Sequence, residues 1–325
     1  MSCWRQYCLR VLLVLVLLAG IGGSWLAVKM RSVRRQKEAV EAIVRMGGFL
    51  DYDRPWTEDA AWPPPAWLRN LLGDDFFARV TYVNLGGPPV TDADVEPLEA
   101  LPQLLGVYLQ GTQLTDAGLE HLRGLGQLQV LFLDGTRITD AGLARLQGFP
   151  LLRSLHLNDT KITDAGLARL DGLIELRELH LSGTKITDAG LEHLAGLTQL
   201  EHLDLTRTHL TGAGLEHLAH LPQLQLLWLG QTRVNDAALA HLKGLRQLRV
   251  LVLANTQVTG AGLEHLKGLT RLEKLILADT HVTDAGLVYL KALAQLKSLW
   301  LGNTQVTDEG AQDLRRALPG CKISR

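Results

Sequence analysis

The chain has 325 residues and a formal net charge of −1, which allows a core of globular size but excludes the basic surface that nucleic-acid binding requires. Its three cysteines, Cys3, Cys8 and Cys321, are too few and too far apart for a disulfide framework or a cysteine-based zinc cluster.

An uncharged apolar segment at residues 11–28 comes after a short N-terminal tail, residues 1–10. Eighteen helical residues span about 27 Å, close to the thickness of the hydrocarbon core. No A-x-A cleavage pattern occurs in the segment, so a single-pass transmembrane anchor is favoured over a cleaved signal peptide. More basic residues lie after the segment than before it, which favours a cytoplasmic C-terminal side. A lone N-terminal anchor more often exports the domain on its C-terminal side, so the side stays open.

The next region, residues 29–65, is expected to contain a juxtamembrane helix and a Pro-rich linker. Apolar residues at helical spacing predict the helix over 29–46, and Gly47 and Gly48 stop it. "WPPPAW" marks the extended linker. An apolar stripe then predicts that residues 66–79 form an N-terminal cap for the repeats that begin at residue 80.

Residues 80–325 repeat with a period of 24. One threonine position shows the period most clearly: Thr112, Thr136, Thr160, Thr184, Thr208, Thr232, Thr256, Thr280 and Thr304. A period of this size indicates a solenoid, in which each coil buries its apolar face only against its neighbours. We expect about ten coils, the first of them irregular because Pro88 replaces the threonine.

One coil, residues 176–199, shows what each position does. Leu179 and Leu181 are two residues apart and point to the core from a short strand, so Glu178 and His180 face outward. The Thr184 hydroxyl is expected to bond the backbone of the buried turn.

Aspartate recurs at a second repeated position, in most coils ahead of the sequence A-G-L. Asp188 is expected to be the N-cap of a short convex helix, because it precedes the apolar stripe of that helix. The same structural explanation is favoured over a row of calcium-binding or catalytic carboxylates for the other members: Asp116, Asp140, Asp164, Asp236, Asp284 and Asp308.

The pattern L-x-x-L-x-L-x-x-T-x-I-T-D-A-G-L resembles a leucine-rich repeat, most closely the cysteine-containing subtype with threonine in place of cysteine or asparagine. With the N-terminal segment, the chain is similar to bacterial membrane-anchored leucine-rich-repeat proteins. The resemblance implies an α/β horseshoe or arc, with a parallel sheet on the concave face and short helices on the convex face. It implies protein binding on the concave face and no enzyme activity. The same subtype also occurs in substrate receptors of ubiquitin ligases, but residues 38–79 do not resemble the F-box that those proteins carry.

The outward strand positions differ from coil to coil, and a partner would contact them. We predict that they form the binding surface: Tyr108, Phe132, His156, Glu178, His180, His202, Asp204, Leu226, Trp228, Val250, Val252, Ile276 and Trp300. Two features stand out, an apolar patch with two tryptophans and a polar cluster of histidines with carboxylates.

The polar cluster leaves an alternative function open. His156, His180 and His202 lie on three adjacent predicted strands, together with the carboxylates of Glu178 and Asp204, so the cluster could form a metal-dependent or acid–base site. A flat sheet gives poor tetrahedral convergence, which favours a polar part of a protein interface instead. The sequence therefore predicts a membrane-anchored scaffold that binds a protein partner, with no enzyme activity, cofactor, metal, small-molecule substrate or nucleic acid.

Overall fold

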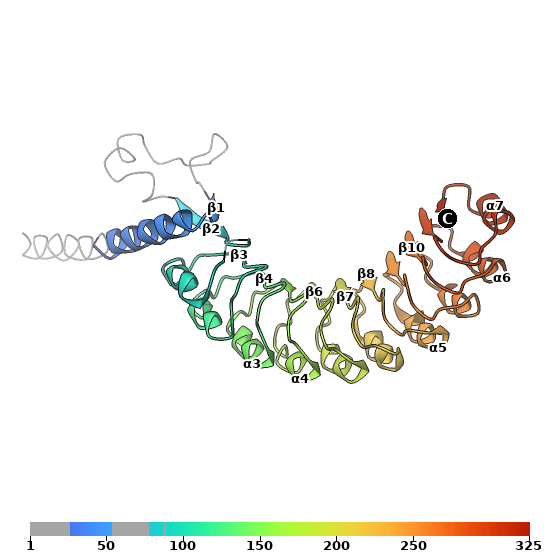
Figure 1. Cartoon of the computed structure of the whole chain (residues 1–325), viewed down its shortest axis with the longest axis horizontal. Coiled ribbons are helices and arrows are strands. Elements are labelled where there is room, and N and C mark those ends of the chain that lie inside the picture. Colours follow the sequence, from blue (N-terminus) through green and yellow to red (C-terminus); the bar gives the residue numbers. More distant parts are fainter. Residues whose placement is uncertain (1–26, 54–77, 88) are drawn as a thin grey trace, which may run out of the picture.

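The computed structural model describes residues 27–53, 78–87 and 89–325. Over these residues the chain forms an arc, with short strands along the concave edge and helical turns along the convex edge (Figure 1). The predicted α/β solenoid is confirmed. Nearly all of the expected anchor, residues 11–28, and of the expected cap, residues 66–79, lies outside the described part. Among the described helices, none combines the length and apolar character needed to cross a membrane.

The strands of the described chain form one twelve-stranded sheet, in which each strand pairs with its neighbours in sequence order. The pairs from β2 to β12 are parallel, and β1 pairs antiparallel with β2. The bounds are β1 Phe49–Asp53, β2 Arg79–Asn84, β3 Gly106–Tyr108, β4 Val130–Phe132, β5 Ser154–His156, β6 Glu178–His180, β7 His202–Asp204, β8 Leu226–Trp228, β9 Val250–Val252, β10 Lys274–Ile276, β11 Ser298–Trp300 and β12 Lys322–Ser324. The central residue of each strand from β3 to β11 is fully buried, because successive side chains alternate between the core and the open face.

Two elements that precede the first coil cover its open end. A helix occupies residues 27–45 of the described chain, and it buries Ala39 and Ile43 in the core. Gln36 Nε2 also donates to the carbonyl of Ala78, at 2.9 Å. The helix expected to leave the membrane thus packs on the solenoid. Residues 51–53 belong to β1 rather than to the linker, and Arg79 begins β2 rather than ending a cap.

On the convex side each coil carries one helical segment or an α-helix followed directly by a 3₁₀ segment. The α-helices are α3 Asp140–Leu143, α4 Asp164–Leu167, α5 Asp236–Leu239, α6 Asp284–Leu287 and α7 Asp308–Ala317. The 3₁₀ segments are η2 Asp92–Ala100, η3 Gly118–Leu122, η4 Ala144–Gly148, η5 Asp188–Leu194, η6 Ala213–His220, η7 Ala240–Gly244, η8 Gly262–Leu266 and η9 Val288–Ala292. Their leucines complete a continuous apolar core, and α7 with β12 forms its C-terminal end.

The repeated threonines act as predicted. Each hydroxyl donates to the carbonyl of the leucine three residues earlier, as in Thr184 Oγ1 to Leu181 O at 2.5 Å. Thr184 is almost fully buried, so this bond satisfies polar atoms that water cannot reach. The residue before each threonine adopts a left-handed conformation, with φ of 69° at Gly183 and 55° at Gln231.

The repeated aspartates do not cap the helices of their own coils, so that prediction is wrong. Thr187 is the N-cap residue of η5, and Asp188 is the first residue inside it. The Asp188 carboxylate instead accepts hydrogen bonds from the Thr211 backbone and hydroxyl in the next coil, at 3.0 and 2.5 Å. In other coils the carboxylate likewise accepts a bond from the backbone N–H of the threonine 23 residues later. These carboxylates belong to Asp92, Asp116, Asp140, Asp164, Asp236 and Asp284. The aspartates therefore join successive coils.

Candidate binding surface on the concave face

The concave face presents two columns of outward side chains, set by the register of the sheet. The first column contains the first residue of each three-residue strand, and the second column contains the last. Glu178 thus lies beside His202, and His180 lies beside Asp204. The structure places all thirteen predicted binding residues in these columns. Each of them is partly accessible to solvent, whereas the central residue of each strand is buried.

The apolar patch consists of Leu226, Trp228, Val250, Val252, Ile276 and Trp300. In-register pairing brings its members together across β8 to β11. Trp300 is 48% exposed, which makes it the most accessible member. Its indole Nε1 donates to Ser298 Oγ at 3.0 Å, and the Lys274 ammonium lies 6.0 Å from its ring centroid. The patch therefore ends beside a cation rather than at another apolar side chain.

A row of rings connects this patch to the polar cluster, although the sequence predicted them as separate features. Tyr108 meets Phe132 edge-on at 4.8 Å between centroids. Phe132 stacks on His156 at 3.6 Å, and His156 stacks on His180 at 4.0 Å. His180 lies 6.0 Å from Trp228, two strands away. The concave face therefore carries one continuous row from β3 to β8.

Tyr82 extends the ring row at its N-terminal end and was not among the predicted residues. Its ring centroid lies 6.5 Å from that of Tyr108. It lies over Gly106, where any Cβ would collide with the tyrosine ring. A glycine at an outward strand position, 24 residues after a tyrosine, was the available signal.

Carboxylates surround the two stacked histidines. His156 Nδ1 lies 3.7 Å from Asp134 Oδ2, and His180 Nδ1 lies 3.8 Å from Asp204 Oδ2. Asp134 was not among the predicted residues, because it lies two positions beyond the end of its strand. Both aspartates also accept backbone N–H bonds at 2.8 Å, Asp134 from Asn158 and Asp204 from Thr206. The Nδ1 side of each imidazole therefore faces a carboxylate that is itself held by a backbone N–H.

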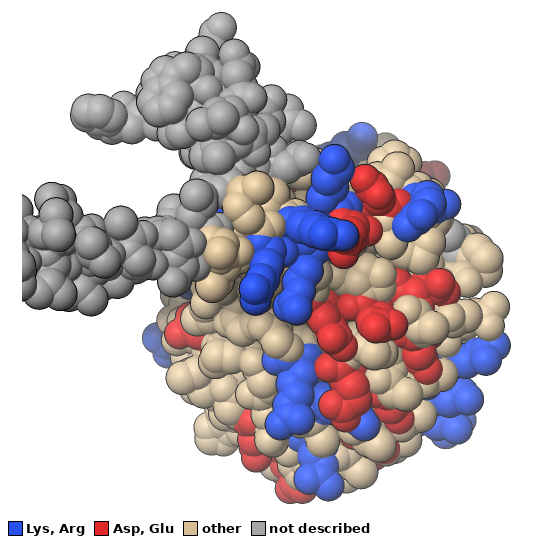
Figure 2. Space-filling model, turned by 90° about the vertical axis from the view of Figure 1, so that its left-hand side faces the viewer, with Lys and Arg blue, Asp and Glu red and all other residues tan. Residues whose placement is uncertain are grey.

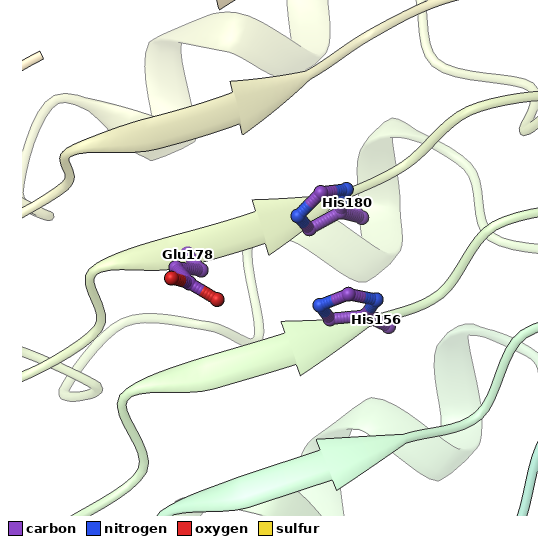
Figure 3. A group of neighbouring side chains, drawn as sticks. All are labelled: His156, Glu178 and His180. Carbon is purple, nitrogen blue, oxygen red and sulfur yellow. The ribbon is translucent and has the colours of Figure 1, made fainter. Parts of the chain in front are cut away.

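Glu178 faces the same two histidines from the first column, as Figure 3 shows. Its Oε2 accepts from Ser154 Oγ at 2.9 Å, and its Oε1 lies 3.2 Å from His202 Nδ1. Within the described residues, the donor atoms of His156, Glu178 and His180 all lie within 4.8 Å of one another. The sequence predicted a cluster of His156, Glu178, His180, His202 and Asp204, and in the structure His156, Glu178 and His180 are the members whose donor atoms converge.

The electrostatic environment keeps His156 neutral. Burial lowers the pKa of its imidazole to about 3, and the nearby charge of His180 acts in the same direction while Asp204 opposes it. Burial also raises the pKa of Asp134. For Asp204, burial acts upward, but the contact with His180 and the bonds from Thr206 lower the pKa overall. Of the two aspartates, Asp204 is thus the more strongly held in its charged form.

A shallow hollow of about 370 Å³ opens beside this group. Tyr108 and Phe132 contribute aromatic walls, Arg153 and Arg177 contribute positive charge, and Glu178 lies at its border. Arg177 is already paired with Glu201 at 2.9 Å. The hollow therefore combines aromatic walls with positive charge and one carboxylate.

Positive and negative side chains are mixed on the face at the N-terminal end of the arc. Viewed from the N-terminal end of the arc, Lys and Arg side chains lie in small groups with Asp and Glu groups next to them (Figure 2). Arg34 pairs with Glu38 at 2.9 Å, and Arg145 pairs with Glu120 at 2.5 Å. The face seen in that view therefore carries no continuous basic surface.

Two family models match parts of the repeat region. A family model described as "Leucine Rich repeat" matches residues 150–170, and one described as "Leucine rich repeat" matches residues 174–234. These matches support a leucine-rich-repeat protein. No curated protein sequence matches the chain significantly.

Solved structures share the fold. An internalin (inlF) from Listeria monocytogenes has a TM-score of 0.59 at 20% identity, covering 79% of this chain and 86% of that one. The mouse RP105/MD-1 complex has a TM-score of 0.55 at 22% identity, covering 65% and 36%. The ectodomain of the Arabidopsis thaliana receptor kinase GASSHO1/SCHENGEN3, in complex with CASPARIAN STRIP INTEGRITY FACTOR 2, has a TM-score of 0.53 at 22% identity, covering 73% and 29%.

Proposed function

We propose that this chain is a scaffold without enzyme activity that binds a protein partner on its concave face. The observation that carries the proposal is the apolar patch, whose members adjoin one another in register and end at a tryptophan that is 48% exposed. Contiguous exposed apolar patches mark interaction sites, and tryptophan is enriched among residues that dominate binding energy.

The architecture supports this proposal. The second column holds large rings or apolar side chains on most strands, whereas the backbone beneath it repeats without change. Repeat scaffolds present such extended concave surfaces to partners. Two of the similar structures are complexes, RP105/MD-1 and the plant ectodomain with its factor. By analogy, they favour a protein or peptide ligand here.

A covalent probe would locate the binding face. A photoreactive amino acid at Ile276, on β10 in the patch, should crosslink the partner in cells. The matched control is Ile174, which is 61% exposed and lies on the turn after α4. The partner crosslinked from Ile276 would be identified by mass spectrometry and then purified. Equal crosslinking of this partner from Ile174 would contradict concave binding.

The purified partner allows the decisive measurement. Replacing Trp228 and Trp300 together by alanine should weaken binding at least about 30-fold, the effect of losing about 2 kcal/mol at an interface hot spot. Circular dichroism should stay unchanged, because both side chains lie on the open face. An unaltered dissociation constant for the double variant would rule out the apolar patch as the binding site.

We also propose that residues 11–28 anchor the scaffold in a membrane, with the repeats on the cytoplasmic side. The support is the uncharged segment and the basic residues after it. Protease added to intact cells should leave the repeats uncut until the membrane is permeabilised. Digestion in intact cells would place them outside, and release of the protein without detergent would exclude the anchor.

A further inference from the structure

The polar cluster contains three donor atoms that point to a common space. In Figure 3 the imidazoles of His156 and His180 lie side by side, and each turns one nitrogen toward the side where Glu178 lies. Donor atoms of the three residues are within 4.8 Å of one another. His156 Nε2 is buried and has no hydrogen-bond partner. An imidazole nitrogen in that condition has an available lone pair if the proton is on Nδ1.

The Nδ1 side of both rings faces a carboxylate. The Nδ1 atoms of His156 and His180 lie 3.7 and 3.8 Å from carboxylate oxygens of Asp134 and Asp204, respectively. A carboxylate on the far nitrogen is the usual companion of a metal-binding histidine, because it orients the ring and raises its basicity. Two adjacent histidines share this arrangement, which a polar protein interface does not require.

The third donor is also held in place. Ser154 on β5 donates to Glu178 Oε2, and His202 on β7 lies against Glu178 Oε1. Phe132 stacks on His156 from the other side. Each side chain of the group is therefore positioned by a neighbour on an adjacent strand, and the sheet supplies the rigidity that a bound ion needs.

We propose that His156, Glu178 and His180 bind one zinc ion on the concave face. Two imidazoles and one carboxylate form an established zinc donor set, with Zn–ligand distances of about 2.0–2.2 Å, and imidazole donors disfavour magnesium and calcium. Zinc binding therefore requires side-chain rotations that bring the donors, now within 4.8 Å of one another, to those distances. The three residues leave one position of a tetrahedral site for water or, if the proposed function is correct, for a carboxylate or imidazole of the partner.

The test measures zinc binding by the full purified chain without any partner, so its outcome is independent of the proposed function. Cys3 and Cys8 are replaced by serine, because thiolates also bind zinc. Competition with a chromophoric chelator should show one ion per chain. His156→Asn, His180→Asn and Glu178→Gln should each weaken zinc binding at least about tenfold. His121→Asn should not; His121 Nδ1 lies 2.6 Å from Glu99 and is the matched histidine–carboxylate pair.

Two further measurements keep the test decisive if a variant folds poorly. Cobalt bound to the unaltered cluster should give the intense visible absorption of a four-coordinate site, and Glu178→Gln should abolish it. Zinc should also raise the Tm of the unaltered chain but not of Glu178→Gln. Binding of less than one zinc ion per chain, or equal affinity in the cluster variants, would overturn the proposal.

Discussion

The core of the coils and the concave face belong to the same repeating backbone, but side chains recur from coil to coil only in the core. Inside, the same contacts recur in successive coils: a buried threonine hydroxyl bonds a leucine carbonyl, and an aspartate reaches a threonine of the next coil. On the concave face, equivalent positions hold tyrosine, histidine, aspartate or tryptophan. The constant positions therefore hold the arc together, and the variable positions form the surface that we propose binds a partner.

Two adjacent leucines on β8 test this division of roles most directly. Leu227 is fully buried and Leu226 is half-buried on the concave face. Leu227→Ala should lower the free energy of unfolding by about 2–5 kcal/mol, because it leaves a cavity in the core. Leu226→Ala should cost about 1 kcal/mol or less and should weaken partner binding instead. Urea denaturation and a dissociation constant would measure both. Similar unfolding costs for the two would contradict the division of roles.

A second prediction concerns the bonds between coils. Asp188→Asn should destabilise the chain by about 1–2 kcal/mol at pH 7, because the carboxylate bonds to Thr211 and two nearby glycines are charge-assisted. Asp171→Asn, at an exposed site on the preceding coil, is the control. Urea denaturation at several pH values would measure both. An equal effect of the two substitutions at pH 7 would show that the inter-coil bonds add nothing.

The pH dependence of Asp188 sharpens that test. Burial raises the pKa of its carboxyl, but the hydrogen bonds from Thr211 and the two glycines outweigh it, so the pKa is lowered overall. The stability from Asp188 is therefore fully present above the unfolded pKa of about 3.9 and is lost as the pH falls through the folded value. The gap between the original chain and Asp188→Asn should stay constant from about pH 5 to about pH 8 and narrow below about pH 4. A gap that widens in acid would contradict this sign.

The smallest expected effect tests the backbone between strand and turn. Gln231 has φ of 55°, a left-handed conformation that costs non-glycine residues about 1 kcal/mol. Gln231→Gly should therefore stabilise the chain by up to about 1 kcal/mol. Gln257→Gly, at an exposed position that is not left-handed, should destabilise it by about 0.5–1 kcal/mol. Thermal unfolding of both variants would show opposite shifts; shifts of the same sign would contradict the assigned strain.

Much of the fold could be predicted because each coil repeats its own local rules. Leu179 and Leu181 point inward by alternation alone, and the hydroxyl of Thr184 reaches a carbonyl only three residues away. The prediction for Asp188 failed because its partner, Thr211, lies 23 residues ahead and becomes a neighbour only when the coils stack. Local N-cap chemistry explained the same residue type equally well, so the pattern could not distinguish the two.

The candidate site, too, could be predicted only where it depends on local rules. The order of side chains in the two columns results from the period, so the apolar patch and the histidine cluster were both predictable. The pairing of His156 with Asp134, and the position of Glu178 in place of His202, depend on the rotamers that neighbouring strands allow. The ring row needs Gly106 to leave space for Tyr82.

The sequence alone was enough to predict the repeat, the strand on each coil and which residues face outward, because periods of two and of 24 residues act through backbone geometry. The elements that close the first coil, the partners of the aspartates and the donors that converge became known only from the folded structure. Those outcomes depend on contacts between segments that are distant in the chain, and such contacts exist only after the coils have packed against one another.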